Sequence, residues 1–181
     1  MRRLSQSLLL LVLLVAVLGC SNSAAQTDSG GIILSVSDFD GLPIAVSVSG
    51  SGGLVQIGQI DIQSIVRNPN GGSSDLMTVE MRSYEVIFSR GDAGSSLPPP
   101  LTRGIFGSVP AGGTITYDNL PIMTTDQLLN PPLSTLAATG QDPDTGGPKI
   151  ILNCRMRFFG RTLSGDAVET TPILFTIDFL P

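Results

Sequence analysis

Apolar and polar residues alternate along much of this chain, and the pattern is clearest toward its C-terminal end. Between residues 150 and 158 the apolar side chains occupy the even positions, and between 173 and 179 they occupy the odd ones. Because successive side chains of a strand point to opposite faces, this pattern predicts two strands that each have one apolar face. The Leu-Ser-Gly-Asp sequence between them predicts a hairpin with Ser164 and Gly165 at its tip.

A two-residue tip fixes which residues of the two strands face each other. With this tip, Cys154 faces Phe175. Leu152 faces Ile177, so the two apolar faces coincide, whereas a slip of one residue would separate them. We therefore expect this hairpin to close the hydrophobic core, with Cys154 packed as a small apolar side chain rather than exposed as a reactive thiol. Pro172 has no N–H to donate, so we expect a bulge or a sheet edge near it.

The same alternation recurs upstream and predicts further strands. Its parity changes near Gly58, which indicates a β-bulge or a short break, and again at residues 82–83, which indicates a second bulge. We expect turns at 38–41 and at 110–113, the second closing a hairpin, and a short helical turn ahead of Pro131. The expected strands are 32–36, 42–48, 54–66, 78–90, 105–109 and 114–120, in addition to the C-terminal hairpin.

Composition agrees with an all-β protein. Glycine (21) and proline (13) are abundant, and only 14% of the 181 residues are charged, which favours short strands joined by turns. The number and spacing of the strands predict an immunoglobulin-like β-sandwich of about 7–9 antiparallel strands with one short helical turn. Tryptophan is absent, and Cys154 has no disulfide partner if Cys20 is modified, so we expect the sandwich architecture without the antibody-type core.

The N-terminal residues have the features of a secretory signal. Arg2 and Arg3 precede an apolar run from residue 8 to residue 18, which is too short for a bilayer-spanning helix of about 20 residues. The sequence Val-Leu-Gly-Cys at 17–20 ends this region and resembles the bacterial lipobox. That resemblance implies cleavage before Cys20 and a lipid on its sulfur, which would anchor the protein in a membrane. An ordinary secreted protein with a chance cysteine is the alternative.

These features divide the chain into a signal peptide (1–19), a flexible tether of small and polar residues (20–31) and a β-sandwich domain (32–181). Ser21 follows the cysteine where lipoproteins retained in the inner membrane have Asp, and this resemblance favours the outer membrane if the cell has two. The expected partners are the membrane, through the Cys20 lipid, and other proteins of the cell envelope.

Five short motifs lie in order over roughly the last hundred residues. They are Ser83-Tyr84-Glu85-Val86, Val109-Pro110-Ala111-Gly112-Gly113, Pro132-Leu133-Ser134-Thr135-Leu136, Phe159-Gly160 and Phe175-Thr176-Ile177-Asp178-Phe179. In this order they resemble a loose group of bacterial lipoproteins with an immunoglobulin-like sandwich. The resemblance implies a fold, but it implies no activity and no functional residues.

Charge and residue usage argue against several functions. The formal net charge is −5, and without Arg2 and Arg3 the chain has eight basic side chains (ten less these two) against fifteen acidic ones. Because Lys and Arg are not clustered, we do not expect nucleic-acid binding. Histidine is absent, which removes the commonest general base and metal ligand, so we expect no enzyme activity and no cofactor other than calcium.

The Asp-Pro-Asp-Thr-Gly sequence at 142–146 is a candidate calcium site. The carboxylates of Asp142 and Asp144, alternating ahead of a glycine turn, could begin the oxygen cage that calcium requires. The later acidic residue that would complete such a loop is missing, so further ligands would have to come from elsewhere, and Asp38 and Asp40 are candidates. The alternative is two ordinary Asp/Gly turns.

Two other groups of residues suggest binding. Arg90-Gly91-Asp92 matches the integrin-recognition tripeptide, with a plain turn as the alternative. The alternation places Arg155, Arg157 and Arg161 on the outer face of one strand. They could bind acidic glycans, or they could pair across the hairpin with Asp178 or Glu169.

The sequence thus predicts a lipid-anchored cell-envelope protein that acts as a non-catalytic structural or interaction module. A calcium- or glycan-binding surface module is the alternative. No specific ligand or partner follows from the sequence.

Overall fold

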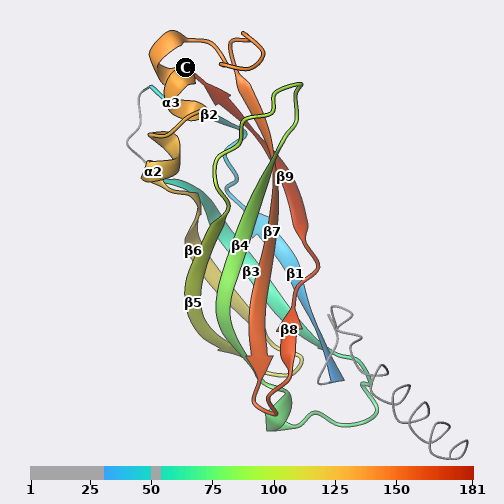
Figure 1. The fold of residues 1–181 in the computed structure, drawn as a ribbon. Coiled ribbons are helices and arrows are strands. Elements are labelled where there is room, and N and C mark those ends of the chain that lie inside the picture. The colour runs from blue at the N-terminus through green and yellow to red at the C-terminus, as the bar shows by residue number, and fades with distance from the viewer. Residues whose placement is uncertain (1–30, 50–53) are drawn as a thin grey trace, which may run out of the picture.

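The computed structural model describes residues 31–49 and 54–181, and within them the chain forms two β-sheets that pack face to face (Figure 1). One sheet has three strands in the order β1-β3-β6, and the other has six, in the order β2-β9-β7-β4-β5 with β8 paired to β7. The strands are β1 (Ile32–Asp40), β2 (Ala45–Ser47), β3 (Val55–Val66), β4 (Val79–Arg90), β5 (Leu101–Val109), β6 (Thr114–Met123), β7 (Ile150–Thr162), β8 (Ala167–Glu169) and β9 (Ile173–Leu180). The helices are η2 (Asp75–Met77), α2 (Thr125–Leu128) and α3 (Leu133–Thr139).

The predicted all-β sandwich is therefore confirmed. Strands β1, β3 and β6 correspond in order to strands A, B and E of an immunoglobulin-like sandwich, and β9, β7, β4 and β5 correspond to G, F, C and C′. The short β2 pairs with β9 in parallel, whereas the other strand pairs are antiparallel. No helix in the described part of the chain is long and apolar enough to cross a membrane.

The core lies between the sheets and is filled by side chains from both. Tyr84 of β4 and Phe158 of β7 are almost fully buried, with ring centroids 5.7 Å apart. The Tyr84 hydroxyl donates a 2.6 Å hydrogen bond to the carbonyl of Pro121 in the opposite sheet, which satisfies the one polar group of this ring. Burial raises the pKa of Tyr84 to about 12, so the hydroxyl stays protonated and remains a donor.

The C-terminal hairpin has the predicted register. Cys154 faces Phe175, and Leu152 faces Ile177. Buried residues alternate along β7 as the sequence indicates. The interruption expected at Pro172 is also present, because the chain is not in a strand at residues 171–172, and these two residues lie opposite Arg157 alone.

The tip of this hairpin differs from the prediction. The Thr162 N–H donates to the Asp166 carbonyl at 2.9 Å, so the turn holds three residues, 163–165, instead of two. Gly165 has a φ of +104°, a conformation that glycine adopts without steric cost. The extra residue in the turn shifts the pairing of β7 with β8 by one, and the bulge at Pro172 restores the predicted pairing of β7 with β9.

Of the two parity changes seen in the sequence, the one at residues 82–83 is a bulge. The register of β4 shifts between Met81 and Ser83 against both of its neighbours. In β3 the buried positions change parity between Ile57 and Ile60, but the pairing with β6 keeps one register from Ile57 to Gln59, so the bulge expected near Gly58 is not present. There the backbone of Gly58 lies so close to Gly41 that a Cβ on Gly58 would be 3.2 Å from the Gly41 Cα.

Several local predictions were wrong. Residues 110–113 form a turn, with the Gly113 N–H bonded to the Pro110 carbonyl at 2.8 Å, but the strands on either side belong to different sheets and do not form a hairpin. Residues 38–40 continue β1 instead of turning, because they pair with β3 after a register shift.

The helical turn predicted ahead of Pro131 is confirmed, because α2 lies there. A second helix, α3, follows the prolines and was not predicted.

Candidate functional site

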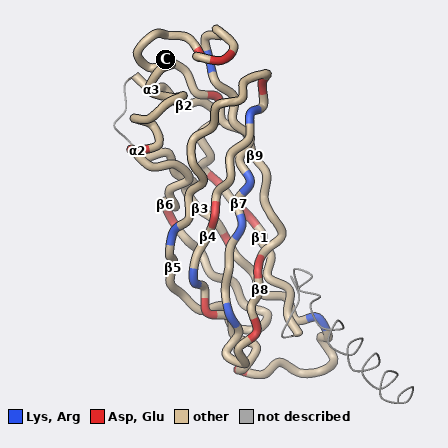
Figure 2. The backbone as a smooth tube through the Cα atoms, in the orientation of Figure 1, with Lys and Arg blue, Asp and Glu red and all other residues tan. Residues whose placement is uncertain are grey.

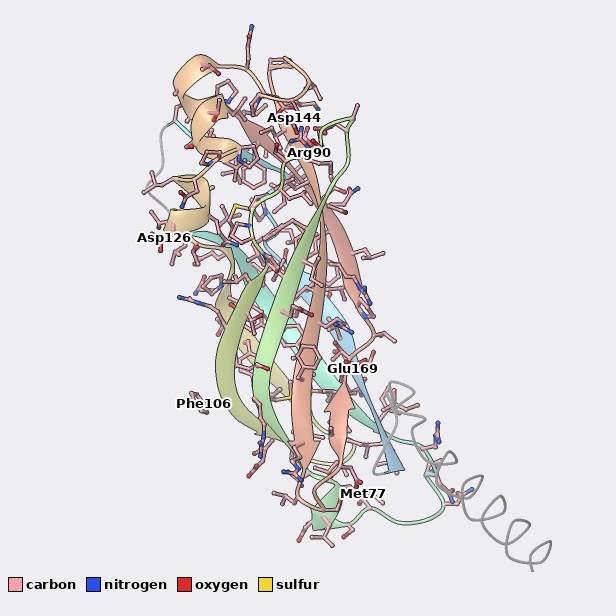
Figure 3. All side chains as sticks on the ribbon, in the orientation of Figure 1. Met77, Arg90, Phe106, Asp126, Asp144 and Glu169 are labelled. Atoms are coloured by element: carbon pink, nitrogen blue, oxygen red, sulfur yellow. The ribbon has the colours of Figure 1, made fainter. Side chains whose placement is uncertain are left out.

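The densest charged network of the described chain surrounds Arg90 at the end of β4 (Figure 3). The Arg90 side chain is only 4% exposed. Its Nε donates to Asp92 at 2.7 Å and its Nη2 to Asp142 at 2.5 Å, while Nη1 lies 3.8 Å from an oxygen of Asp144. One guanidinium thus joins the loop after β4 to the loop before β7.

The carboxylates of this network are held in their charged forms. The hydrogen bond from Arg90, followed by backbone N–H groups, lowers the pKa of Asp92 to about 2. The backbone N–H groups of Ser96 and Ser95 lower the pKa of Asp144 to about 2. Burial alone would lower the pKa of Arg90, but its bonds to Asp92 and Asp142 outweigh burial and raise it.

These contacts bear on the predicted calcium residues. Asp142 accepts from Arg90 and Thr145, and both oxygens of Asp144 accept from Ser95 and Ser96. The positive charge at their centre is therefore the protein's own guanidinium. Within 31–49 and 54–181 there is no group of three or more His, Cys, Asp or Glu placed to hold a metal ion.

The residues suggested as further calcium ligands lie elsewhere. Asp38 and Asp40 belong to β1 and line a small hollow of about 80 Å³ with Gln59 and Asp61 of β3. The structure therefore places Asp142 and Asp144 against Arg90, Ser95 and Ser96, and places Asp38 and Asp40 in a strand away from them.

The integrin-type tripeptide at 90–92 is not displayed for a partner. The guanidinium of Arg90 is internal, and Asp92 accepts the N–H groups of Gly94 and Ile151 as well as the bond from Arg90. The adhesion hypothesis is therefore wrong for this fold, and the turn is the correct interpretation.

Cys154 is 1% exposed and packs on the apolar face of β7. Burial raises the pKa of its thiol to about 12, so the nucleophilic thiolate is not populated near neutral pH. The interpretation of Cys154 as a core residue is confirmed.

The arginine row on the outer face of β7 is largely paired within the protein. Arg157 lies 3.0 Å from Glu85 on β4 and 3.5 Å from Glu169, as predicted across the hairpin, and its guanidinium lies over the ring of Phe159. Arg161 donates to the carbonyl of Gly165 at 2.6 Å. Asp178, the other predicted partner, pairs with Lys149 instead, and Figure 2 shows basic and acidic residues interspersed along this sheet.

A feature that the sequence reasoning missed is Phe106 on β5. Its side chain is 90% exposed and points away from the body of the protein (Figure 3). Within the described chain β5 pairs with β4 alone and so forms one edge of the six-stranded sheet. Phe106 borders a shallow hollow of about 600 Å³ that we call the Phe106 surface, lined by Glu80, Met81, Arg82, Phe106, Gly107 and Ser108.

A bulge explains why this ring faces outward. Met81 pairs with Gly107 and Ser83 with Gly104, so two residues of β5, Ile105 and Phe106, lie opposite Arg82 alone. Ile105 is buried, and the residue after it faces solvent. The alternation in the sequence could have indicated that Phe106 points outward, because in a strand whose buried positions are Ile105 and Val109, residue 106 belongs to the outer face.

Comparisons with known proteins leave the function open. No family model matches the chain, and no curated protein matches its sequence significantly. A solved structure described as the X-ray structure of Northeast Structural Genomics Consortium target SoR45 is similar, with a TM-score of 0.39 and 8% identity over 81% of this chain and 86% of that one.

Proposed function

We propose that this protein is a lipid-anchored, non-catalytic interaction module of the cell envelope, and that it binds a protein partner through the Phe106 surface. The observation that supports this most directly is the 90% exposure of Phe106, because burying this ring against a partner would contribute about 1.5–3 kcal/mol to binding. Aromatic side chains are also the residues that most often dominate binding energy at protein interfaces.

The surroundings of Phe106 suit a protein partner. An edge strand presents backbone N–H and C=O groups that have no partner within their own sheet, and an extended segment of another protein can pair with them. Glu80 and Arg82, which lie 3.7 Å apart and are each more than half exposed, provide a polar rim beside the ring. An apolar anchor with a charged border is the usual composition of a reversible interface.

The anchoring part of the proposal is supported by the lipobox-like sequence at 17–20, which lies outside the described residues. A thioether-linked diacylglycerol with an N-acyl chain on Cys20 would provide the two or more hydrocarbon chains that stable membrane attachment requires. Serine at position 21 favours the outer membrane in a cell with two membranes.

Substitution of the exposed ring tests the binding surface. In Phe106→Ser the recovery of the partner from cross-linked envelope should fall at least about tenfold, because losing an aromatic anchor costs about 2 kcal/mol or more. Leu174→Ser is the matched control, since Leu174 is also an exposed apolar residue (72%) but lies on β9, away from β5. The measurement is quantitative mass spectrometry of proteins cross-linked to the full-length, membrane-inserted chain.

Both variants should melt at the wild-type temperature, because neither side chain belongs to the core. If Phe106→Ser and Leu174→Ser retain the same cross-linked proteins in the same amounts as wild type, Phe106 does not contact a partner and the binding proposal fails.

A further inference from the structure

The end of the sandwich where β1 begins exposes several aliphatic side chains. Strand β1 starts beside η2 and the turn between β7 and β8, at the end of the protein where Figure 3 labels Met77 (Figures 1 and 3). We call this region the anchor-proximal end and define it by its exposed residues: Ile33 (36% exposed), Ile65 (41%), Leu76 (58%) and Leu163 (49%).

Backbone hydrogen bonds hold together the two segments that carry Leu76 and Leu163. The N–H of Leu163 donates to the Thr78 carbonyl at 2.9 Å, and the N–H of Ser164 donates to the Leu76 carbonyl at 3.0 Å. These bonds tie the turn after β7 directly to η2. The two leucines therefore lie on turns that are bonded to each other through the backbone.

The start of the described chain lies at this same end of the protein. The Arg67 N–H donates to the Gly31 carbonyl at 3.0 Å. A Cβ on Gly31 would lie 3.4 Å from the terminal methyl of Met77, the residue after Leu76. Ile33 pairs with Ile65 one strand away. Whatever holds residue 20 is therefore connected to the protein at this end.

Chain length limits how far this end can lie from a lipid on Cys20. The eleven residue-to-residue steps from Cys20 to Gly31 cannot span more than about 36–40 Å even when fully extended. Strand β7 has 13 residues and extends for about 43 Å toward the other end, where the α-helices (Figure 1) and Arg90 (Figure 3) lie. A membrane that holds Cys20 is thus always within reach of the anchor-proximal end, whereas the tether sets no such limit on the opposite end.

We propose that the anchor-proximal end contacts the lipid surface, with Leu76 and Leu163 inserted among the headgroups. This inference rests on the proposed lipidation of Cys20, because two leucines alone bury too little apolar surface for lasting attachment. The lipid supplies the attachment, and the leucines then orient the sandwich so that the Phe106 surface faces sideways and the helices face away from the membrane. Charges of both signs border the site, including Arg161 and Asp75, so the contact depends on apolar burial rather than on anionic lipid.

A label that reports its surroundings tests the contact. Leu76→Cys and Leu163→Cys would each be labelled with an environment-sensitive fluorophore in the full, lipidated chain, and the protein placed in phosphatidylcholine vesicles that contain a lipid-borne quencher. Cys154 is buried and Cys20 is acylated, so neither takes the label. Leu129→Cys is the matched control, because Leu129 is 68% exposed and follows α2 near the opposite end.

We expect the quencher to reduce the emission at positions 76 and 163 at least threefold more than at position 129. Equal quenching at all three positions in lipidated protein would overturn the membrane contact while leaving the anchor intact. The intact mass of the same samples separates the two proposals, because a chain without lipid on Cys20 would overturn both.

Discussion

At the scale of single residues, Arg90 decides how the carboxylates at one end of the sandwich are used. The sequence singled out Asp142 and Asp144 as candidate calcium ligands, but it could not show that Arg90 lies against them. Arg90 precedes Asp142 by 52 residues, and no local spacing signals that the two meet. The position of β5 at the edge of its sheet, which leaves room around Phe106, is likewise not visible in a local pattern.

Removal of the arginine should be costly. In Arg90→Met the carboxylate of Asp142, whose side chain has no exposed surface, loses its cation, and we expect the free energy of unfolding to fall by about 3–5 kcal/mol near pH 7. That difference should shrink as the pH falls from about 4 to about 2. The reason is that a carboxyl whose pKa is lowered in the folded state, as for Asp92 at about 2, stabilises the fold above its unfolded pKa of about 3.9 and loses that effect on protonation. Urea unfolding of the wild-type and Arg90→Met proteins near pH 7 and near pH 2 measures this difference in the free energy of unfolding.

Arg82→Met is the control for this experiment. Arg82 is 57% exposed and its contact with Glu80 is 3.7 Å, so its loss should change stability by less than about 1 kcal/mol. If Arg90→Met and Arg82→Met had equal effects, or if the Arg90→Met difference were constant with pH, the Arg90 network would not be what stabilises this end of the sandwich.

At the scale of elements, the sequence predicts strands and bulges well and turns less well. Parity located the bulge at residues 82–83, because a bulge moves apolar side chains from one parity to the other while the core stays on one side. Near Gly58 the buried positions also change parity, but the register with β6 does not shift, so parity alone did not distinguish the two cases. The same logic gave the pairing of Leu152 with Ile177. It could not show the three-residue tip, since the extra residue there is offset by the bulge at Pro172 before the predicted pairs begin.

The bulge in β4 depends on glycine in the neighbouring strand. A Cβ on Gly160 would lie 2.6 Å from Cγ1 of Val79 and 2.9 Å from the carbonyl oxygen of Glu80. Because these atoms are packed or part of the backbone, Gly160→Ala should lower the free energy of unfolding by about 1–3 kcal/mol. Urea titration with the same slope for both proteins would measure this difference.

Gly104→Ala on β5 is the matched comparison. The nearest atom to its Cβ would be 3.8 Å away, an ordinary contact, so this variant should be neutral or more stable by up to about 1 kcal/mol. A Gly160→Ala protein as stable as Gly104→Ala would show that β4 and β7 can separate at the bulge, and that Gly160 is not closely packed on Val79.

At the scale of the whole molecule, composition and strand spacing were enough to predict an immunoglobulin-like sandwich, but not the sheet to which each strand belongs. The turn at 110–113 has the residues of a hairpin, yet β5 pairs with β4 and β6 pairs with β3. A tight turn fixes only a change of direction, and burial of the apolar faces decides whether the chain stays in one sheet or crosses to the other. Long-range packing of this kind is not encoded in a local pattern.

The two proposed surfaces together would set how the whole molecule is placed at the membrane. The lipid at Cys20 and the leucines of the anchor-proximal end would hold one end of the sandwich at the membrane. Phe106, on an edge strand, would then be presented to the side, where neighbouring envelope proteins lie. The orientation of both surfaces depends on the lipid, because without it nothing holds the protein at a fixed angle to the membrane.

The most direct test of membrane anchoring is therefore the intact mass of the protein extracted from its native envelope. We predict a mature chain that begins at Cys20 and is heavier than its sequence by one diacylglyceryl group and one acyl group. A mature chain with an unmodified Cys20, or one that begins at another residue, would contradict it.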